Sequence, residues 1–296
     1  LAKKKVLKTE KYWIQYEDGI CLDIQCGNSA YVFGYSDKEI LSAISSNLIH
    51  FVRNGAGETS QQTAWLINEL LEMSGMSALS WAVSGSDAVE SAIALNDQYW
   101  GDFNRILTIS PNYHGTTYLC KALRKEVLLD RVVTVNRTTD LKTLESIEAA
   151  LRRDPSIGCI IAESIPWVEG VNPYSSLFWT ELRSICDRFE INLLIDDVAG
   201  SFGKLGYGFS HQRWGIEPDI VAIAKSLTGG YSPLSAALCN EKIYKNIRKA
   251  DVYDHYSTNS KLLKLINHDF IDFREGLMNT INFYREIFES LPKIEK

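Results

Sequence analysis

No apolar run in this sequence approaches the roughly 20 residues that a helix needs to cross a bilayer. The first residues also lack the apolar core of a secretory signal peptide. The formal charge of −6 argues against a nucleic-acid partner, because binding to phosphates needs a basic surface. We therefore expect a cytoplasmic protein with neither a membrane nor a nucleic acid as its partner.

Spacings typical of metal sites or disulfide frameworks are missing as well. The six cysteines are scattered, at positions 21, 26, 120, 159, 186 and 239, and the five histidines are dispersed. Structural zinc sites need closely paired cysteine and histidine ligands. We therefore expect reduced thiols and no bound metal.

Strand-like and helical segments alternate along the chain. Short apolar runs predict strands at residues 78–83, 105–109, 132–135, 159–165, 193–196 and 220–224. Helical patterns separate most of them, at residues 87–100, 141–152 and 176–189. This alternation predicts an α/β fold with a mostly parallel central sheet that is covered on both faces.

The chain has no internal repeat, low-complexity tract or linker rich in proline and glycine. We predict an N-terminal segment over residues 1–55, a large domain over 56–250 and a short C-terminal helical segment over 251–296. The first segment reads as a hairpin and a helix that would pack on a neighbouring subunit. The apolar periodicity of the last segment fits core packing or a dimer contact.

Lys225 stands out because it directly follows a predicted buried strand. A Gly-Gly turn and a proline come after it. A buried ammonium is costly unless it is paired or used chemically, and desolvation makes it a better amine nucleophile. Such an amine can form a Schiff base with an aldehyde such as pyridoxal phosphate. The alternative is a lysine that extends its charged end from the strand into solvent.

Three other segments fit the same cofactor. Asp196 and Asp197 end a strand, and a carboxylate there could keep the ring nitrogen of pyridoxal phosphate protonated. Residues 84–87, Ser-Gly-Ser-Asp, precede a helical pattern and could bind its phosphate. Tyr113 could stack on its flat ring. Each segment also has a plain structural explanation: loop-capping aspartates, a simple N-cap and a packed loop tyrosine.

Taken together, these motifs resemble those of the class III aminotransferases, the pyridoxal-phosphate enzymes of fold type I. The family's Ser-Gly-Ser-Glu-Ala-x-Glu, aromatic-His-Gly and Glu-Pro-Ile are similar to residues 84–90, 113–115 and 163–165. Its Asp-Glu-Val, Phe-Gly-Arg-x-Gly and lysine motifs are similar to residues 196–198, 202–206 and 225–233. The resemblance runs from about residue 12 to about residue 258, with the motifs in the family's order. It implies a fold type I large domain.

The resemblance assigns the cofactor site. Lys225 would form the Schiff base and then move a proton between substrate and cofactor. Asp196 would hold the pyridine nitrogen, Val198 would pack behind the ring, and Tyr113 would stack on its other face. Further cofactor-binding residues would be Gly85, Ser86 and His114.

The resemblance also implies a substrate pocket and an assembly. Glu163, similar to the family's active-site glutamate, would be a catalytic and cofactor-binding residue that also helps to shape the pocket. Thr258, in a segment similar to the family's His-Gly-x-Thr, would reach the phosphate in the neighbouring subunit. The protein would then be a homodimer with shared active sites. Its reaction would be a transamination between a primary amine or amino acid and a keto acid or aldehyde.

Two departures from the family leave other functions open. The segment between Gly115 and the predicted strand at 132–135 is short, and the small C-terminal domain that often carries a carboxylate-binding arginine is reduced or missing. The alternatives are another pyridoxal-phosphate reaction (aminomutase, decarboxylase or epimerase) and a catalytically reduced binding subunit. Trp13, Tyr31 and Trp167 are possible pocket aromatics.

Overall fold

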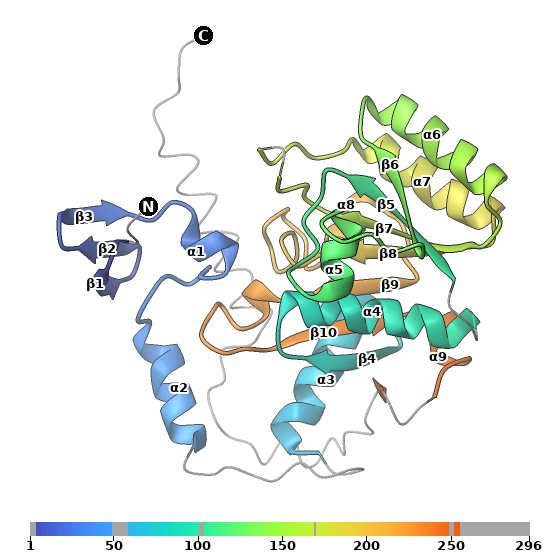
Figure 1. The fold of residues 1–296 in the computed structure, drawn as a ribbon. Coiled ribbons are helices and arrows are strands. Elements are labelled where there is room, and N and C mark those ends of the chain that lie inside the picture. Colours follow the sequence, from blue (N-terminus) through green and yellow to red (C-terminus); the bar gives the residue numbers. More distant parts are fainter. Residues whose placement is uncertain (1–3, 49–58, 101–103, 169, 249–251, 255–296) are drawn as a thin grey trace.

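A central sheet organises the molecule (Figure 1). The computed structural model describes residues 4–48, 59–100, 104–168, 170–248 and 252–254, and within these ranges the sheet has eight strands in the order β11-β4-β10-β9-β8-β7-β5-β6. The strands are β4 (Ala78–Ala82), β5 (Arg105–Ser110), β6 (Val132–Asn136), β7 (Ile157–Glu163), β8 (Asn192–Asp196), β9 (Ile220–Ile223), β10 (Ser235–Cys239) and β11 (Tyr253–Asp254).

The prediction of a mostly parallel sheet is confirmed. Parallel pairing joins β9, β8, β7, β5 and β6, and β4 runs in the same direction because β10 is antiparallel to both β4 and β9. All six predicted strands are present. Strand β10 has no counterpart among them, because its sequence Ser-Ala-Ala-Leu-Cys contains few residues that favour strands.

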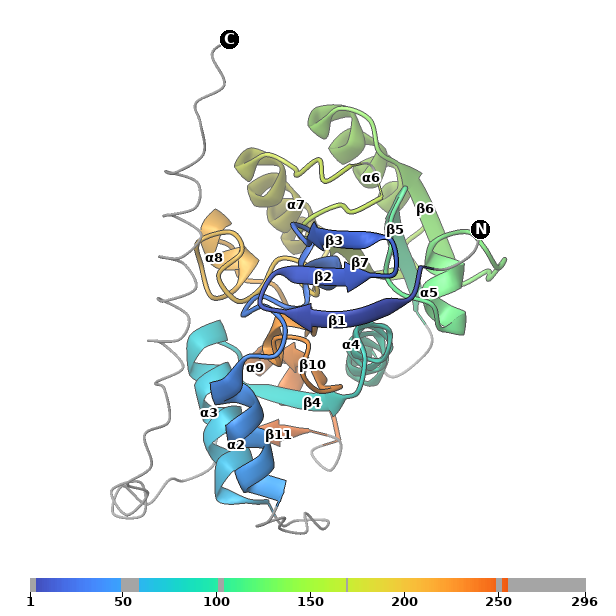
Figure 2. The ribbon, with the colours of Figure 1, turned by 90° about the vertical axis from the view of Figure 1, so that its left-hand side faces the viewer.

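Helices cover both faces of the sheet, as the alternation predicts (Figures 1 and 2). One face packs on α4 (Gly85–Trp100), α5 (Tyr118–Leu123) and α9 (Glu241–Tyr244). The other packs on α6 (Asp140–Arg153) and α7 (Ser176–Arg188) beside β5, β7 and β8, and on α3 (Gln61–Ser74) beside β9 and β10. Because both faces are buried, strands such as β7 are apolar at nearly every position.

The N-terminal segment forms a separate antiparallel sheet, and its residues 29–37 contact the loop that carries Lys225. Its elements are β1 (Val6–Glu10), β2 (Trp13–Tyr16), β3 (Gly19–Leu22), α1 (Cys26–Ser29) and α2 (Lys38–Leu48). The Tyr231 hydroxyl receives the backbone N–H of Asp37 at 2.7 Å and donates to the carbonyl of Gly34 at 2.8 Å. Ser226 Oγ donates to the carbonyl of Ser29 at 3.3 Å. These bonds fix the segment against the turn that follows Lys225.

The predicted hairpin and helix of the N-terminal segment are present, and their packing on a neighbouring subunit stays a prediction. The division into three segments stays a prediction too. Most of the C-terminal segment, with Thr258, lies outside the described residues. In the part that the structure describes, none of the helices, which include the short α8 (Ser210–Trp214), combines the length and apolarity that a bilayer crossing requires.

Candidate active site

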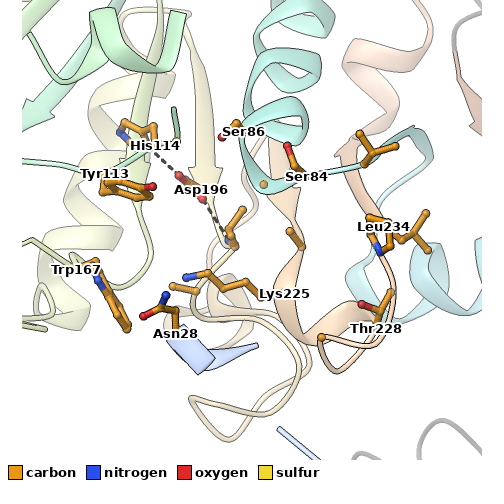
Figure 3. A pocket seen from close by; sticks show the side chains of 18 of the residues that line it. Asn28, Ser84, Ser86, Tyr113, His114, Trp167, Asp196, Lys225, Thr228 and Leu234 are labelled. Atoms are coloured by element: carbon orange, nitrogen blue, oxygen red, sulfur yellow. Dashed lines mark hydrogen bonds and ion pairs between the residues drawn. The ribbon is translucent and has the colours of Figure 1, made fainter. Parts of the chain in front are cut away.

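A cavity of about 570 Å³ opens at the carboxyl ends of the parallel strands, where open α/β sheets bind ligands (Figure 3). Parallel strands bring residues that are distant in the sequence to one edge. Eight of the nine predicted site residues line this cavity, and the ninth, Thr258, is outside the described residues. The eight are Gly85, Ser86, Tyr113, His114, Glu163, Asp196, Val198 and Lys225.

The first turn of α4 forms one end of the cavity and has the features of a phosphate cradle. Ser84 caps the helix, because its hydroxyl receives the backbone N–H of Asp87 at 3.2 Å. Ser86 Oγ receives the N–H of Thr116 at 3.0 Å, which joins the helix to the loop after β5. Gly115 in that loop has φ +128°, and a Cβ there would collide with the Ser86 hydroxyl. The close approach therefore requires glycine, and it keeps the helix N-terminus open to an anion.

Asp196 is held in place by a chain of hydrogen bonds. Its Oδ2 lies 2.8 Å from His114 Nδ1, and its Oδ1 receives the N–H of Val198 at 3.2 Å. A carboxylate can only accept, so Nδ1 is the donor of this pair. On the other side of the ring, Nε2 lies 3.4 Å from the Thr108 hydroxyl, which itself receives a hydrogen bond from Asn112. This chain fixes the orientation of the carboxylate in the cavity.

Asp197, the next residue, has a different environment. It does not line the cavity, and it receives the backbone N–H and the hydroxyl of Ser210. It is fully buried, and burial raises its pKa to about 6 against the lowering effect of these hydrogen bonds. The choice of Asp196 rather than Asp197 as the cofactor carboxylate agrees with this geometry.

Glu163, at the end of β7, connects two loops that border the cavity. It receives the backbone N–H of Tyr113 at 3.0 Å, and the backbone N–H of Trp167 also stabilises its charge. Burial nevertheless dominates and raises its pKa to about 7; the nearby Asp196 adds to the increase, and His114 opposes it. A single carboxylate thus positions the backbones of both cavity aromatics.

Lys225 begins a short 3-10 turn, separated from the end of β9 by one residue, with φ +43°. Burial lowers the pKa of its amine, and the negative charges of Asp196 and Glu163 oppose that change. A lowered pKa leaves more of the neutral amine available as a nucleophile near neutral pH.

A second buried lysine, Lys204, lies near Lys225 but does not line the cavity. Burial and the charge of Lys225 lower its pKa to about 7, whereas Asp197 raises it. Its Nζ is buried without a hydrogen-bond partner among the residues that the structure describes. It stands where the resemblance would place an arginine.

The space between Tyr113 and Val198 suits a flat ring. Both residues line the cavity, and Gly85 packs so closely on Val198 that a Cβ there would lie 3.0 Å from Val198 Cγ1. Arg124 lies over the Tyr113 ring at 4.8 Å from its centroid. Arg124 itself does not line the cavity. The residues present therefore fit a phosphorylated pyridine aldehyde: a helix N-terminus, a carboxylate, a stacking ring and an amine.

Other residues of the cavity wall were not singled out as site residues from the sequence. Asn28 comes from α1, and Thr228, Ser232 and Leu234 come from the loop after Lys225. No local pattern marks Asn28, because only the fold brings the N-terminal segment to this edge.

Of the three possible pocket aromatics, only Trp167 lines the cavity. Trp13 is 50% exposed on β2, and Tyr31 packs on Tyr35 with ring centroids 4.5 Å apart. Both side chains belong to the N-terminal segment, which reaches the cavity through other residues. Among the described residues, no cluster of three or more histidine, cysteine or acidic side chains could hold a metal ion.

Comparison with known proteins gives the family. A model of the class III aminotransferases matches residues 3–262, most of the chain. The chain belongs to the class III aminotransferase family. The expected family is therefore confirmed. Solved structures similar to this chain include an amine transaminase in a pyridoxal-phosphate-bound form and a taurine:2-oxoglutarate aminotransferase in complex with pyridoxal phosphate.

Individual relatives agree with this assignment. The chain is 28% identical over 245 residues to taurine–pyruvate aminotransferase of Bilophila wadsworthia, with 72% of this chain and 53% of the relative covered. It is also 28% identical over 246 residues to succinylornithine transaminase of Photorhabdus laumondii, with 80% and 60% covered. The chain therefore spans about half the length of the first of these relatives and three fifths of the second.

Solved structures show the same fold. A transaminase from the marine bacterium Virgibacillus superposes with a TM-score of 0.80 at 18% identity, covering 97% of this chain and 69% of that one. An amine transaminase from an uncultivated Pseudomonas species gives 0.78 at 23% identity, covering 98% and 71%. These similarities confirm the predicted fold type I large domain.

The raised pKa of Glu163 predicts a pH-dependent stability. A carboxyl whose folded pKa is about 7 and whose ordinary value is 4.5 binds more protons in the folded state between these values. Its contribution is therefore most favourable below about pH 4.5 and is lost as the pH rises through about 7, with a full extent on the order of 3 kcal/mol. Glu163→Gln should remove this loss. Urea unfolding of both proteins from about pH 5 to 8 should show a difference that grows with pH.

Asp197 and Lys204 also titrate in or near this range, but they are present in both proteins and cancel in the difference. Parallel stability curves for wild type and Glu163→Gln would contradict the assignment to Glu163.

Proposed function

We propose that this chain is a pyridoxal-phosphate-dependent aminotransferase that transfers an amino group between a primary amine or amino acid and a keto acid or aldehyde. The observation that carries the proposal is the placement of one lysine amine and one carboxylate on the same cavity as an open helix N-terminus. Lys225, Asp196 and the first turn of α4 supply these three parts. Family membership supports the same reaction.

When bound, pyridoxal phosphate supplies an aldehyde for covalent capture of amines and an electron-poor ring that stabilises negative charge on the substrate. Lys225 provides the amine that would attach the cofactor. Once released, the same amine can take a proton from one substrate atom and return it to another, as a general base and then a general acid. Burial lowers the pKa of this amine, which makes the neutral form needed for the base role easier to reach than in an exposed lysine.

The other residues bind and orient. Asp196 supplies the negative charge that would keep the ring nitrogen protonated, and His114 keeps its carboxylate in one orientation. The N–H groups of the first α4 turn and Ser86 would hold the phosphate. Tyr113 and Val198 would enclose the ring, which fixes it and keeps water from its faces.

The proposal names the substrates only by class, as a primary amine or amino acid and a keto acid or aldehyde. The relatives act on substrates as different as taurine and succinylornithine, to judge from their names. A cytoplasmic location also belongs to the proposal, and the free thiols of all six cysteines support a reducing compartment.

The covalent link provides the first test. The purified chain should bind pyridoxal phosphate with visible absorbance that borohydride removes, and peptide mapping should place the reduced adduct on Lys225. Lys225→Ala should abolish the adduct and keep the fold. Lys204→Ala is the matched control, since Lys204 is also a buried lysine with a lowered pKa but lies outside the cavity wall. An adduct on Lys204, or one that survives Lys225→Ala, would refute the proposal.

The adjacent aspartates provide the second test. Asp196→Asn keeps the shape of the site and loses the charge, so the barrier to turnover should rise by several kcal/mol, roughly a factor of 10 in rate per 1.4 kcal/mol. Asp197→Asn should change turnover per bound cofactor little. It should instead lower the free energy of unfolding by about 1–3 kcal/mol, because the amide keeps only one acceptor oxygen and leaves one of the two buried Ser210 donors without a partner. Measurements of turnover and urea unfolding separate the two effects; equal and mild losses of turnover would sink the assignment of Asp196.

We also propose a homodimer in which Thr258 contributes to the partner's phosphate site. The N-terminal sheet supports an interface, because it exposes a group of large apolar side chains: Val6, Leu7, Trp13, Ile20 and Leu22 are each at least 50% exposed. A two-fold interface would form two shared sites at once.

The dimer predicts that cofactor retention depends on protein concentration. Dilution should release cofactor, and added cofactor should stabilise the dimer by mass action. Thr258→Ala should weaken retention modestly, because a hydrogen bond to a charged group is worth about 1.5–3 kcal/mol and the α4 turn still holds the phosphate. Sedimentation with absorbance detection follows both quantities. A monomer that keeps full cofactor occupancy would rule out the shared site.

A further inference from the structure

The amine of Lys225 faces an aromatic ring rather than a carboxylate. Its Nζ lies 4.9 Å from the centroid of the Trp167 ring, and Figure 3 shows the amine directed toward that side of the cavity. In the part of the chain that the structure describes, Nζ forms no hydrogen bond or ion pair. The nearest acidic side chains act on it only at longer range.

Both of these carboxylates already have partners. Asp196 is engaged by His114 and by the N–H of Val198, and Glu163 is engaged by the N–H of Tyr113 and that of Trp167. Neither lies within the 4.0 Å that an ion pair with Nζ would need. The electron-rich face of the indole is therefore the group that offers close electrostatic stabilisation to this partly desolvated cation.

The backbone of Trp167 is held by a hydrogen bond to a buried side chain. Its backbone N–H interacts with Glu163 at the end of β7, and Glu163 also holds the Tyr113 loop. The backbone of Trp167 is thus tied to the carboxyl end of β7, although the residue lies in a loop.

We propose that the indole of Trp167 is the resting site of the Lys225 ammonium whenever that amine carries no carbonyl partner. The ring raises the proton affinity of the free amine and keeps it beside the cavity. The assignment of Lys225 as the reactive amine rests on the proposed function, but the contact with Trp167 and its test do not. Trp167 is in this sense a positioning residue.

The test measures the proton affinity of Lys225 directly in the chain without added cofactor. Trace acetylation with acetic anhydride across about pH 7 to 11, with Lys225 quantified by peptide mass spectrometry, gives a titration profile. Exposed Lys121 in the same digest serves as the internal reference. The plateau at high pH reports access of the reagent, and the midpoint reports proton affinity, so a change in access alone does not move the midpoint.

Trp167→Leu removes the aromatic face and keeps an apolar side chain. We expect its Lys225 midpoint to fall by about 0.4 to 1.5 pH units, the range that cation–π energies allow. Trp167→Phe keeps a weaker aromatic face and should shift the midpoint by a smaller amount. Val168→Ala, at an exposed neighbour in the same loop, controls for disturbance of the loop and should match wild type.

The other charged groups around Lys225 are shared by all four proteins. They are Asp196 and its partner His114, Glu163 and Lys204. A Trp167→Leu midpoint equal to wild type would overturn the proposal. Equal shifts in the leucine and phenylalanine variants would overturn it too, because they would indicate water access rather than an effect of the aromatic face. This titration uses the protein without cofactor. In the separate experiment with pyridoxal phosphate, a failure of borohydride to trap an adduct on Lys225 would therefore count against the proposed function and not against the contact with Trp167.

Discussion

Desolvation of charged side chains is the constraint that shapes both ends of the parallel strands. Buried charges are fully paired at the amino ends and only partly paired at the carboxyl ends. At the amino edge, buried Asp219 accepts hydrogen bonds from the Leu193 N–H at 2.8 Å, from Arg183 at 2.9 Å and from Asn240 at 3.1 Å. Every part of that carboxylate is paired, which is how a buried charge becomes structural. At the carboxyl edge, the acids are oriented by histidine and backbone groups, and the lysine amine has no carboxylate in direct contact. Charge that is positioned but not neutralised is available for chemistry.

Besides packing in the core, strand β10 positions two of the segments that form the cavity. It lies between β4 and β9, and so places the segment after β4 beside the turn after β9. The Ser235 hydroxyl donates to the carbonyl of Ser84 at 2.7 Å, which ties the α4 cradle to the chain that leaves the Lys225 loop. The α4 end and the Lys225 end of the cavity are therefore connected through the antiparallel strand β10 as well as through the rest of the sheet.

The sequence predicts the parts of this protein that depend on local pattern. The six parallel strands follow from apolar runs, and the lysine, the aspartates and the Ser-Gly-Ser turn follow from motifs at their ends. Strand β10 is not predicted, because its sequence contains few residues that favour strands, and its two alanines are placed only by tertiary packing: Ala237 in the cluster with α4 and Ala236 in the cluster with α3. Asn28 and the contact between Trp167 and Lys225 are not predicted from the sequence, for another reason. They depend on how loops from distant parts of the chain meet, and neither spacing nor composition carries that information.

The two adjacent aspartates, Asp196 and Asp197, show how the pleat of a strand decides which side chain reaches the cavity. Asp196 ends β8 and Asp197 follows it, and successive residues of a strand direct their side chains to opposite faces. Asp196 therefore reaches the cavity and His114, which comes from the loop after β5. Asp197 points the other way and binds the first turn of α8 through Ser210. One carboxylate fixes the loop that follows β8, and that loop in turn supplies Val198 to the cavity. The structural aspartate thus supports the cavity that its neighbour lines, and a shift of register by one residue would exchange their positions.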